Sequence, residues 1–180
     1  LKDIRGIVLR EFKYKESSKI IEVFTEDLGK ISVICQGVLK KNSKNLGLTN
    51  RFILASFALY KSGKDFYGLR EGLVLNPYYK SNKNFDIILY KSAIADLLLR
   101  TIDHIQIETV FTLLTNCFEA FEKADEGYIN IFLGFLIKYI SFSGFKPNFK
   151  SCGICGKNIR GKYLYFSPSG SSVICDECKD

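Results

Sequence analysis

Two closely spaced pairs of cysteines are the residues of this sequence best suited to chemistry. Cys152 and Cys155 form the first pair, and Cys175 and Cys178 form the second, with 19 residues between the pairs. This C-x2-C-x19-C-x2-C pattern falls within the spacing typical of zinc ribbons. Two thiolates two residues apart can occupy one edge of a metal tetrahedron when a tight turn brings their sulfur atoms together. The pattern therefore predicts one structural Zn²⁺ bound by all four cysteines.

Disulfides and a redox-active dithiol are the alternative interpretations of these cysteines. Disulfides are rare in cytoplasmic proteins, and a redox CxxC motif needs a single pair beside a βαβ unit. Catalytic zinc is disfavoured, because a site with four sulfur ligands leaves no position for a substrate. In addition, the only histidine, His104, lacks the glutamate two residues later that zinc deaminases require. Cys35 and Cys117 lie within apolar patterns, where burial in the core is expected.

The segment between the two pairs has the pattern of a β-hairpin. Residues 163–166 and 173–174 are β-prone and are separated by a turn rich in Ser, Pro and Gly. Gly156 permits the left-handed backbone of a metal-binding knuckle directly after the first pair. The hairpin is expected to carry the second pair back to the first.

The basic residues are concentrated in the first half of the chain. The net charge is +7, and residues 1–80 alone carry 15 basic and 8 acidic side chains. A localised excess of this kind indicates a face that binds a polyanion, of which nucleic acid is the commonest. A basic surface that serves only solubility is the alternative.

The first 75 residues have the pattern of a small β-barrel. The predicted strands are 4–11, 19–25, 30–36, 51–60 and 65–75. Five short strands without long helices between them favour an OB-type barrel. Residues 37–50 contain Lys40, Lys41 and Lys44 and are expected to form an exposed, mobile basic loop.

Helical periodicity begins after a stretch rich in Pro and Asn at residues 76–84, and helices are predicted over 85–102, 108–124 and 127–143. The last of them is apolar almost all round and is predicted to lie at the centre of a bundle. Gly144 occupies the position of a left-handed C-cap.

The sequence as a whole predicts an α+β protein in three parts. Residues 1–80 are expected to form the five-stranded OB-type barrel, and residues 81–150 a helical bundle. Residues 151–180 are expected to form a zinc-ribbon-like element with four cysteine ligands, inserted in the helical part or appended to it.

The sequence has no motif for nucleotide hydrolysis, dinucleotide binding, serine hydrolysis or zinc proteolysis, so a non-enzyme is predicted. No secretory signal opens the chain. The most apolar stretch, residues 128–142, contains Asn130 and Lys138 and is too short and too polar to cross a bilayer. A cytoplasmic protein without a membrane partner is expected.

The order of these parts resembles that of the bacterial recombination-mediator family RecO. The opening strands carry the resemblance at residues 6–10, Tyr14, 16–17, 23–25 and 29–30. The join at residues 144–147, followed by Cys152 to Gly156, is similar to that family's transition from helix to zinc element.

The resemblance implies binding of single- and double-stranded DNA, annealing of complementary strands, and help in loading recombinase onto strands coated by single-strand-binding protein. The implied partners are RecR and the acidic C-terminal tail of single-strand-binding protein, and the implied location is the bacterial nucleoid. An RNA- or ribosome-associated OB and zinc-ribbon module is the alternative.

Phosphate contacts are expected from the basic residues of the first strand and the following loops: Arg10, Lys13, Lys15, Lys40, Lys41 and Lys44, with Lys30, Arg51, Lys61 and Lys64 as second choices. Phe12 and Tyr14 interleave with these cations, so they are candidates for base stacking. Lys91 and Arg100 are nominated for the rim of an apolar groove that would receive a partner tail.

Overall fold

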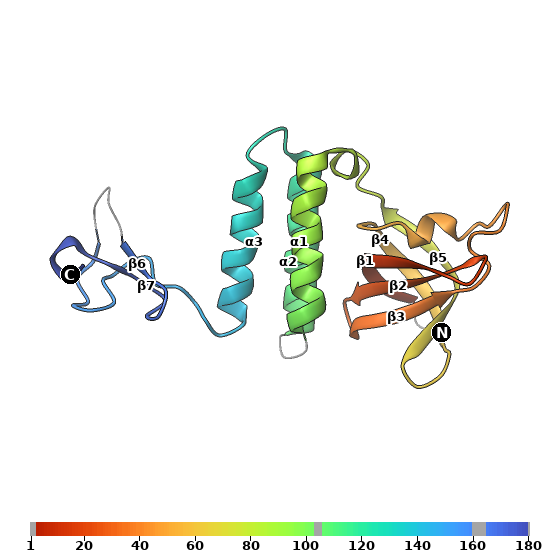
Figure 1. The fold of residues 1–180 in the computed structure, drawn as a ribbon, viewed down its shortest axis with the longest axis horizontal. Helices are drawn as coiled ribbons and strands as arrows, with labels where there is room; N and C mark the ends of the chain where they lie inside the picture. Colours follow the sequence, from red (N-terminus) through yellow and green to blue (C-terminus); the bar gives the residue numbers. More distant parts are fainter. Residues whose placement is uncertain (1–2, 103–105, 160–164, 180) are drawn as a thin grey trace. The chain divides into compact units, whose positions relative to one another are not determined.

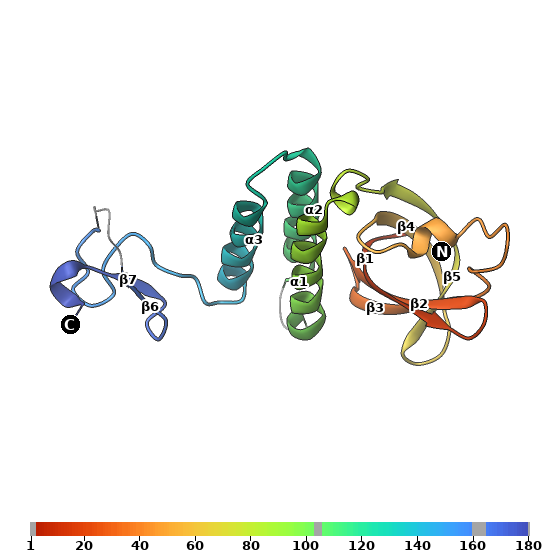
Figure 2. The same cartoon turned by 45° about the horizontal axis from the view of Figure 1, so that its top comes forward.

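The computed structural model describes residues 3–102, 106–159 and 165–179. The first part of the chain forms five strands that enclose one interior (Figure 1 and Figure 2). Their bounds are β1 (Asp3–Tyr14), β2 (Ser18–Thr25), β3 (Gly29–Cys35), β4 (Leu54–Lys61) and β5 (Phe66–Asn76). Each of the five predicted strands is present.

The barrel is closed in the order β1-β2-β3-β5-β4. All neighbours are antiparallel except β3 and β5, which run parallel. Side chains alternate across each strand, so one set fills the interior, including Val8, Ile21, Val33 and Phe57. The five-stranded barrel predicted from the sequence is confirmed.

The segment between β3 and β4 is less exposed than predicted. Val38 and Leu48 are 1% and 3% exposed and belong to the barrel core. Leu48 lies in a short 3-10 helix, η1 (Leu46–Thr49). The expectation of an exposed loop over all of residues 37–50 was wrong at these two positions and at Thr49, which is also buried. One apolar side chain near each end suffices to anchor a loop that lacks a repeating pattern.

Three helices follow the barrel: α1 (Phe85–Thr101), α2 (Ile107–Lys123) and α3 (Tyr128–Phe142). The Asn84 side chain caps α1 by accepting a hydrogen bond from the backbone amide of Ile87. One side of α2 is buried, from Val110 to Phe121. None of the helices in the part of the chain that the structure describes is long and apolar enough to cross a membrane.

The prediction that α3 lies buried at the centre of a bundle was wrong. Phe135 and Tyr139 are buried, but Ile129, Leu133 and Ile137 are each more than 40% exposed. Composition predicts how apolar a helix is, whereas burial depends on how many neighbours cover it. Within the N-terminal unit, α3 contacts α1 through stacked rings of Phe132 and Tyr90.

Barrel and helices share aromatic contacts. The Phe24 ring of β2 lies 6.1 Å from the Phe111 ring of α2, measured between centroids. Phe118 of α2 packs edge-on against Phe52, before β4, and against Tyr78, after β5. These five rings are almost fully buried, so α2 is part of the same core structure as the barrel.

Lys91 of α1 is completely buried beside these rings. Its Nζ donates hydrogen bonds to Ser81 Oγ (2.7 Å) and Asn82 Oδ1 (2.8 Å). The same Nζ lies 4.6 Å from the centroid of the Phe118 ring. The nomination of Lys91 for the rim of an exposed groove was therefore wrong, since its amine is enclosed between the linker and two helices. Arg100 is exposed.

The chain divides into two compact units, residues 1–135 and 136–180. In the second unit, β6 (Tyr165–Ser167) and β7 (Ser172–Ile174) form the predicted hairpin, whose residues 163–164 lie outside the described residues. Gly144 adopts the expected left-handed backbone, with φ of +89°.

Lys91 makes the stability of the fold dependent on pH. Burial lowers the pKa of Lys91 to about 7, although the negative charge of Glu122 raises it in part. In the unfolded chain, the pKa of a lysine is near 10.4. Between these values the unfolded state binds the proton and the folded state does not, so the free energy of unfolding rises with pH. Relative to Lys91→Met, the wild type should gain up to about 1.4 kcal/mol per pH unit between pH 7 and 10.

Urea unfolding of both proteins at pH 7, 8 and 9 measures this difference. The exposed-lysine variant Lys123→Met is the control and should follow the wild type. Parallel curves for the wild type and Lys91→Met would contradict the prediction.

Candidate functional site

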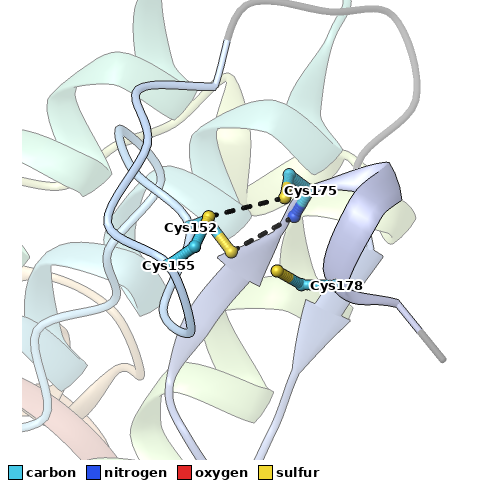
Figure 3. A group of neighbouring side chains, drawn as sticks. All are labelled: Cys152, Cys155, Cys175 and Cys178. Carbon is cyan, nitrogen blue, oxygen red and sulfur yellow. Dashed lines mark hydrogen bonds between the residues drawn. The ribbon is translucent and has the colours of Figure 1, made fainter.

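The four cysteines of the C-terminal unit converge on one point, as Figure 3 shows. Cys152 and Cys155 lie in a tight turn that Gly156 ends with a left-handed φ of +72°. Cys175 follows β7, and Cys178 ends the short 3-10 helix η4 (Asp176–Cys178). Their Sγ atoms all lie within 4.8 Å of one another, so the predicted ligand set is assembled in space.

The sulfur spacing fits a tetrahedral metal site. Cys155 Sγ and Cys175 Sγ are 3.7 Å apart. A tetrahedron with Zn–S bonds of about 2.3 Å places its sulfur atoms about 3.8 Å apart. A disulfide requires about 2.05 Å, and none of the four cysteines is in one. The geometry therefore matches the metal interpretation and not the disulfide alternative.

The four thiols have unequal proton affinities. Hydrogen bonds from backbone amides, first those of Cys155 and Cys175, lower the pKa of Cys152 to about 6. The neighbouring Cys175 thiol and burial raise the pKa of Cys178 to about 12. Four thiolates this close repel one another, and a divalent cation removes that repulsion. The donor set thus fits Zn²⁺, with all four positions of the tetrahedron supplied by protein.

The two knuckles are held together by contacts around the sulfur atoms. A Cβ on Gly153 would lie 1.9 Å from Ser172 Oγ, so only glycine allows the first turn to approach β7 this closely. The Gly153 amide donates to the Val173 carbonyl (2.9 Å). On the exposed side, Lys157 of the first knuckle pairs with Glu177 of the second at 2.5 Å.

The remaining candidates for metal or acid-base chemistry lie elsewhere. Cys35 and Cys117 are buried, as predicted, and burial raises the pKa of Cys35 to about 12, so this thiol is not reactive. His104 lies outside the described residues. Among residues 3–102, 106–159 and 165–179, the four-cysteine cluster is the one group of three or more metal-ligating side chains.

Part of the predicted phosphate-binding set gathers at one end of the barrel. Lys13 lies near the end of β1 and Lys15 in the turn between β1 and β2, and the segment carrying Lys40 is tied to that turn. The tie is a hydrogen bond from the Leu39 amide to the Ser17 carbonyl (2.8 Å). All three lysines are exposed, as are Lys41 and Lys44 on the same segment.

Arg10 has a different environment from these lysines. Its guanidinium pairs with Asp96 of α1 at 2.5 Å and with Glu22 of β2 at 3.6 Å. Two carboxylates therefore compensate the charge of Arg10, and it connects β1 to α1. Its role as a phosphate contact stays a prediction.

The second-choice cations are dispersed. Lys30 donates to the Leu99 carbonyl of α1, and Arg51 donates to the Leu9 carbonyl and to Ser92. Lys61 lies over the Tyr67 ring at 4.6 Å, and Lys64 is exposed in the turn between β4 and β5.

An apolar stripe crosses the outside of the barrel beside the lysines. We define it as Phe12, Ile20, Ile34 and Tyr60, with Gly68 between the last two. Each is directly opposite the next across neighbouring strands, so together they form a continuous row on the outside of the barrel. Phe12 and Tyr60 are 46% and 38% exposed. A Cβ at Gly68 would lie 2.1 Å from the Tyr60 ring, so the glycine lets that ring lie directly over β5.

The sequence pattern predicts Phe12 as a stacking residue but does not point to the other members of the apolar stripe. Along each strand, these residues alternate with residues of the barrel core, and this alternation indicates that they point outward. That signal does not show which outward residues align, because alignment depends on the register between strands distant in sequence. Tyr14, the second predicted stacking residue, is 36% exposed and has Lys15 over its ring.

Comparison with known proteins matches both parts of the chain to one family. Residues 1–78 match the family model of the N-terminal part of recombination protein O. Residues 83–180 match the model of its C-terminal part. The two models together span nearly the whole sequence.

Curated proteins named "DNA repair protein RecO" are similar along the chain. The one from Caldicellulosiruptor saccharolyticus is 29% identical over 177 residues, covering 98% of this chain and 71% of the relative. The one from Clostridium acetobutylicum is 29% identical over 176 residues, with 97% and 70% covered. The one from Listeria monocytogenes serovar 1/2a is 28% identical over 175 residues, with 96% and 67% covered.

Metal analysis of the purified protein tests the cysteine cluster. We expect about one zinc ion per chain, as for other four-cysteine sites. Cys155→Ser removes one of four ligands, so it should lose most of the metal, and Cys117→Ala should keep it. Inductively coupled plasma mass spectrometry gives the stoichiometry. A metal-free wild type, or full zinc content in Cys155→Ser, would refute the assignment.

Proposed function

The chain belongs to the RecO family of recombination proteins, and on this basis we propose that it binds single- and double-stranded DNA and anneals complementary strands. We further propose that it assists recombinase loading on strands coated by single-strand-binding protein. The proposed partners are RecR and the C-terminal tail of single-strand-binding protein, and the proposed location is the bacterial cytoplasm. The family consists of non-enzymatic mediators, so binding and positioning carry the activity.

The apolar stripe is the observation that carries the DNA-binding proposal. It presents two exposed aromatic rings, of Phe12 and Tyr60, on the outer face of the barrel. Bases of any sequence stack on such rings, while cations nearby neutralise the phosphates. Lys13 and Lys15 lie beside the Phe12 end of the stripe, and Lys61 lies beside its Tyr60 end. This combination suits a single strand better than a duplex, whose bases are already stacked.

The helices cover only part of the outer surface of the barrel and leave the apolar stripe uncovered at Ile20. On β2, Phe24 and Ile20 point to the same outer side. Phe24 is fully buried, with Phe111 of α2 against it, whereas Ile20 is half-buried. The region of the barrel available to a strand is therefore the part around Ile20 and the neighbouring lysines.

Annealing requires no catalytic group in this proposal. Two complementary strands repel each other through their phosphates, and cations that screen this repulsion let the strands meet. Bases held on aromatic rings stay unpaired but accessible to a complementary strand. The zinc site supports the C-terminal unit structurally, since its four protein ligands leave no position for DNA or water.

Salt dependence tests the contribution of the lysine segment. Replacing Lys40, Lys41 and Lys44 together by Ala should weaken single-strand binding. It should also flatten the slope of log K against log[salt] by up to about 2, equivalent to three phosphate contacts. Fluorescence anisotropy with a labelled oligonucleotide, over a salt series from about 50 to about 300 mM NaCl, measures it.

A matched triple variant controls for the loss of charge alone. Lys123, Lys138 and Lys146 lie outside the barrel, and their replacement by Ala should leave the slope unchanged. An unchanged slope in the Lys40, Lys41 and Lys44 variant would remove that segment from the DNA-binding surface.

Substitutions in the apolar stripe test base stacking. Phe12→Ala and Tyr60→Ala should each weaken single-strand binding by about 1–3 kcal/mol, because each removes one stacking ring. Both should slow annealing of bare and of coated strands in a fluorescence-quenching assay. Phe85→Ala removes a ring that is 72% exposed on α1 and serves as the control. Wild-type protein that prefers RNA and anneals no DNA would contradict the proposed function.

A further inference from the structure

A concave region lies between the segment before β4 and the linker after β5. It is a hollow of about 390 Å³. Arg51 and Asn50 line it on one side, and Tyr79, Asn82 and Lys83 line it on the other. It belongs entirely to the N-terminal unit, and none of its lining residues is part of the apolar stripe.

Two strained backbone positions adjoin residues that line this hollow. Phe52 and Tyr78 adopt left-handed φ values of +63° and +49°, which are unusual for bulky side chains. Both rings are buried edge-on against Phe118, while the preceding Arg51 and the following Tyr79 line the hollow. Such strain persists only where the surrounding structure enforces it, and it concentrates at functional sites.

The hollow carries uncompensated positive charge. Among the residues that the structure describes, no carboxylate forms an ion pair with Arg51 or Lys83. The Arg51 guanidinium is held in place by stacking on Phe52 at 4.4 Å and by hydrogen bonds to the Leu9 carbonyl and Ser92. Asn82, which lines the hollow, accepts a hydrogen bond at its Oδ1 from the buried Lys91 amine at 2.8 Å. An anionic group is the ligand that this arrangement attracts.

An exposed ring stands beside these cations. Tyr79 is 71% exposed, and the structure gives its side chain no hydrogen bond or ring contact among the described residues. A large aromatic side chain left in water next to two cations offers a stacking surface with phosphate-binding groups at its edge. A planar base attached to a phosphate matches both parts.

We propose that this hollow binds one nucleotide of a DNA single strand, with its phosphate on Arg51 and Lys83 and its base stacked on Tyr79. The proposal rests on the DNA binding proposed above and adds a second contact region to it. The hollow adjoins the Leu54 end of β4, and the apolar stripe crosses β4 at Tyr60. The rise along a strand separates these two ends of β4 by about 20 Å, so the two regions are tested independently.

Photo-crosslinking maps the contact directly. A single strand containing 5-bromodeoxyuridine is irradiated with the full-length protein, and mass spectrometry identifies the crosslinked peptides. We expect a crosslink at Tyr79, lost in Tyr79→Ala. Lys83→Glu should reduce the yield at Tyr79 and the single-strand affinity about tenfold, comparable to the loss of one stacked base. Lys123→Glu makes the same charge change on α2, away from the hollow, and should alter neither.

The outcomes separate this inference from the proposed function. Crosslinks confined to the apolar stripe, with Tyr79 unmodified, would overturn the inference and leave DNA binding intact. A wild type that binds no single strand would overturn both. In a final experiment, thymidine monophosphate and inorganic phosphate are added as competitors and the Tyr79 crosslink is measured. If either competitor at micromolar concentration abolishes the Tyr79 crosslink, the hollow is a site for a free small anion, and the assignment to a strand is overturned.

Discussion

The arrangement of the N-terminal unit depends on one buried amine. Lys91 reaches from α1 into a space enclosed by aromatic rings, where it meets Ser81 and Asn82 of the linker. Glu122 of α2 accepts hydrogen bonds from the amide and hydroxyl of Ser81. The linker that leaves the barrel is therefore tied to both helices at once. A buried polar group is costly unless its hydrogen-bond partners are in place, so this network permits few alternative placements of the linker.

The fixed linker determines which barrel surfaces remain available. The helices cover the outer face around Phe24 and leave the apolar stripe open. Phe52 and Tyr78 pack on Phe118 and have left-handed backbone at both positions. Their sequence neighbours Arg51 and Tyr79 line the hollow. The same packing that joins barrel and helices thus creates the two surfaces to which we assign nucleic-acid contacts.

The C-terminal unit is stabilised by different means. Its two-stranded sheet has three residues in each strand, and among its described residues Tyr139, Cys152 and Val173 are the buried apolar ones. A unit with so small a core needs a covalent or metal crosslink to hold its fold. Four converging thiols supply the ligands, and the close approach at Gly153 supplies the geometry.

Local patterns in the amino-acid sequence are enough to predict part of this structure. The five strands, the three helices and the four-cysteine set follow from periodicity, turn residues and spacing, which act within about twenty residues. The burial of Lys91, the exposed apolar residues of α3 and the pairing of Arg10 with Asp96 follow instead from how distant segments pack. The alignment of the apolar stripe was decided at the same level. Each of these features depends on which distant segments meet and in what register. The contacts that stabilise them form between segments far apart in the sequence, so no short stretch of the chain can predict them.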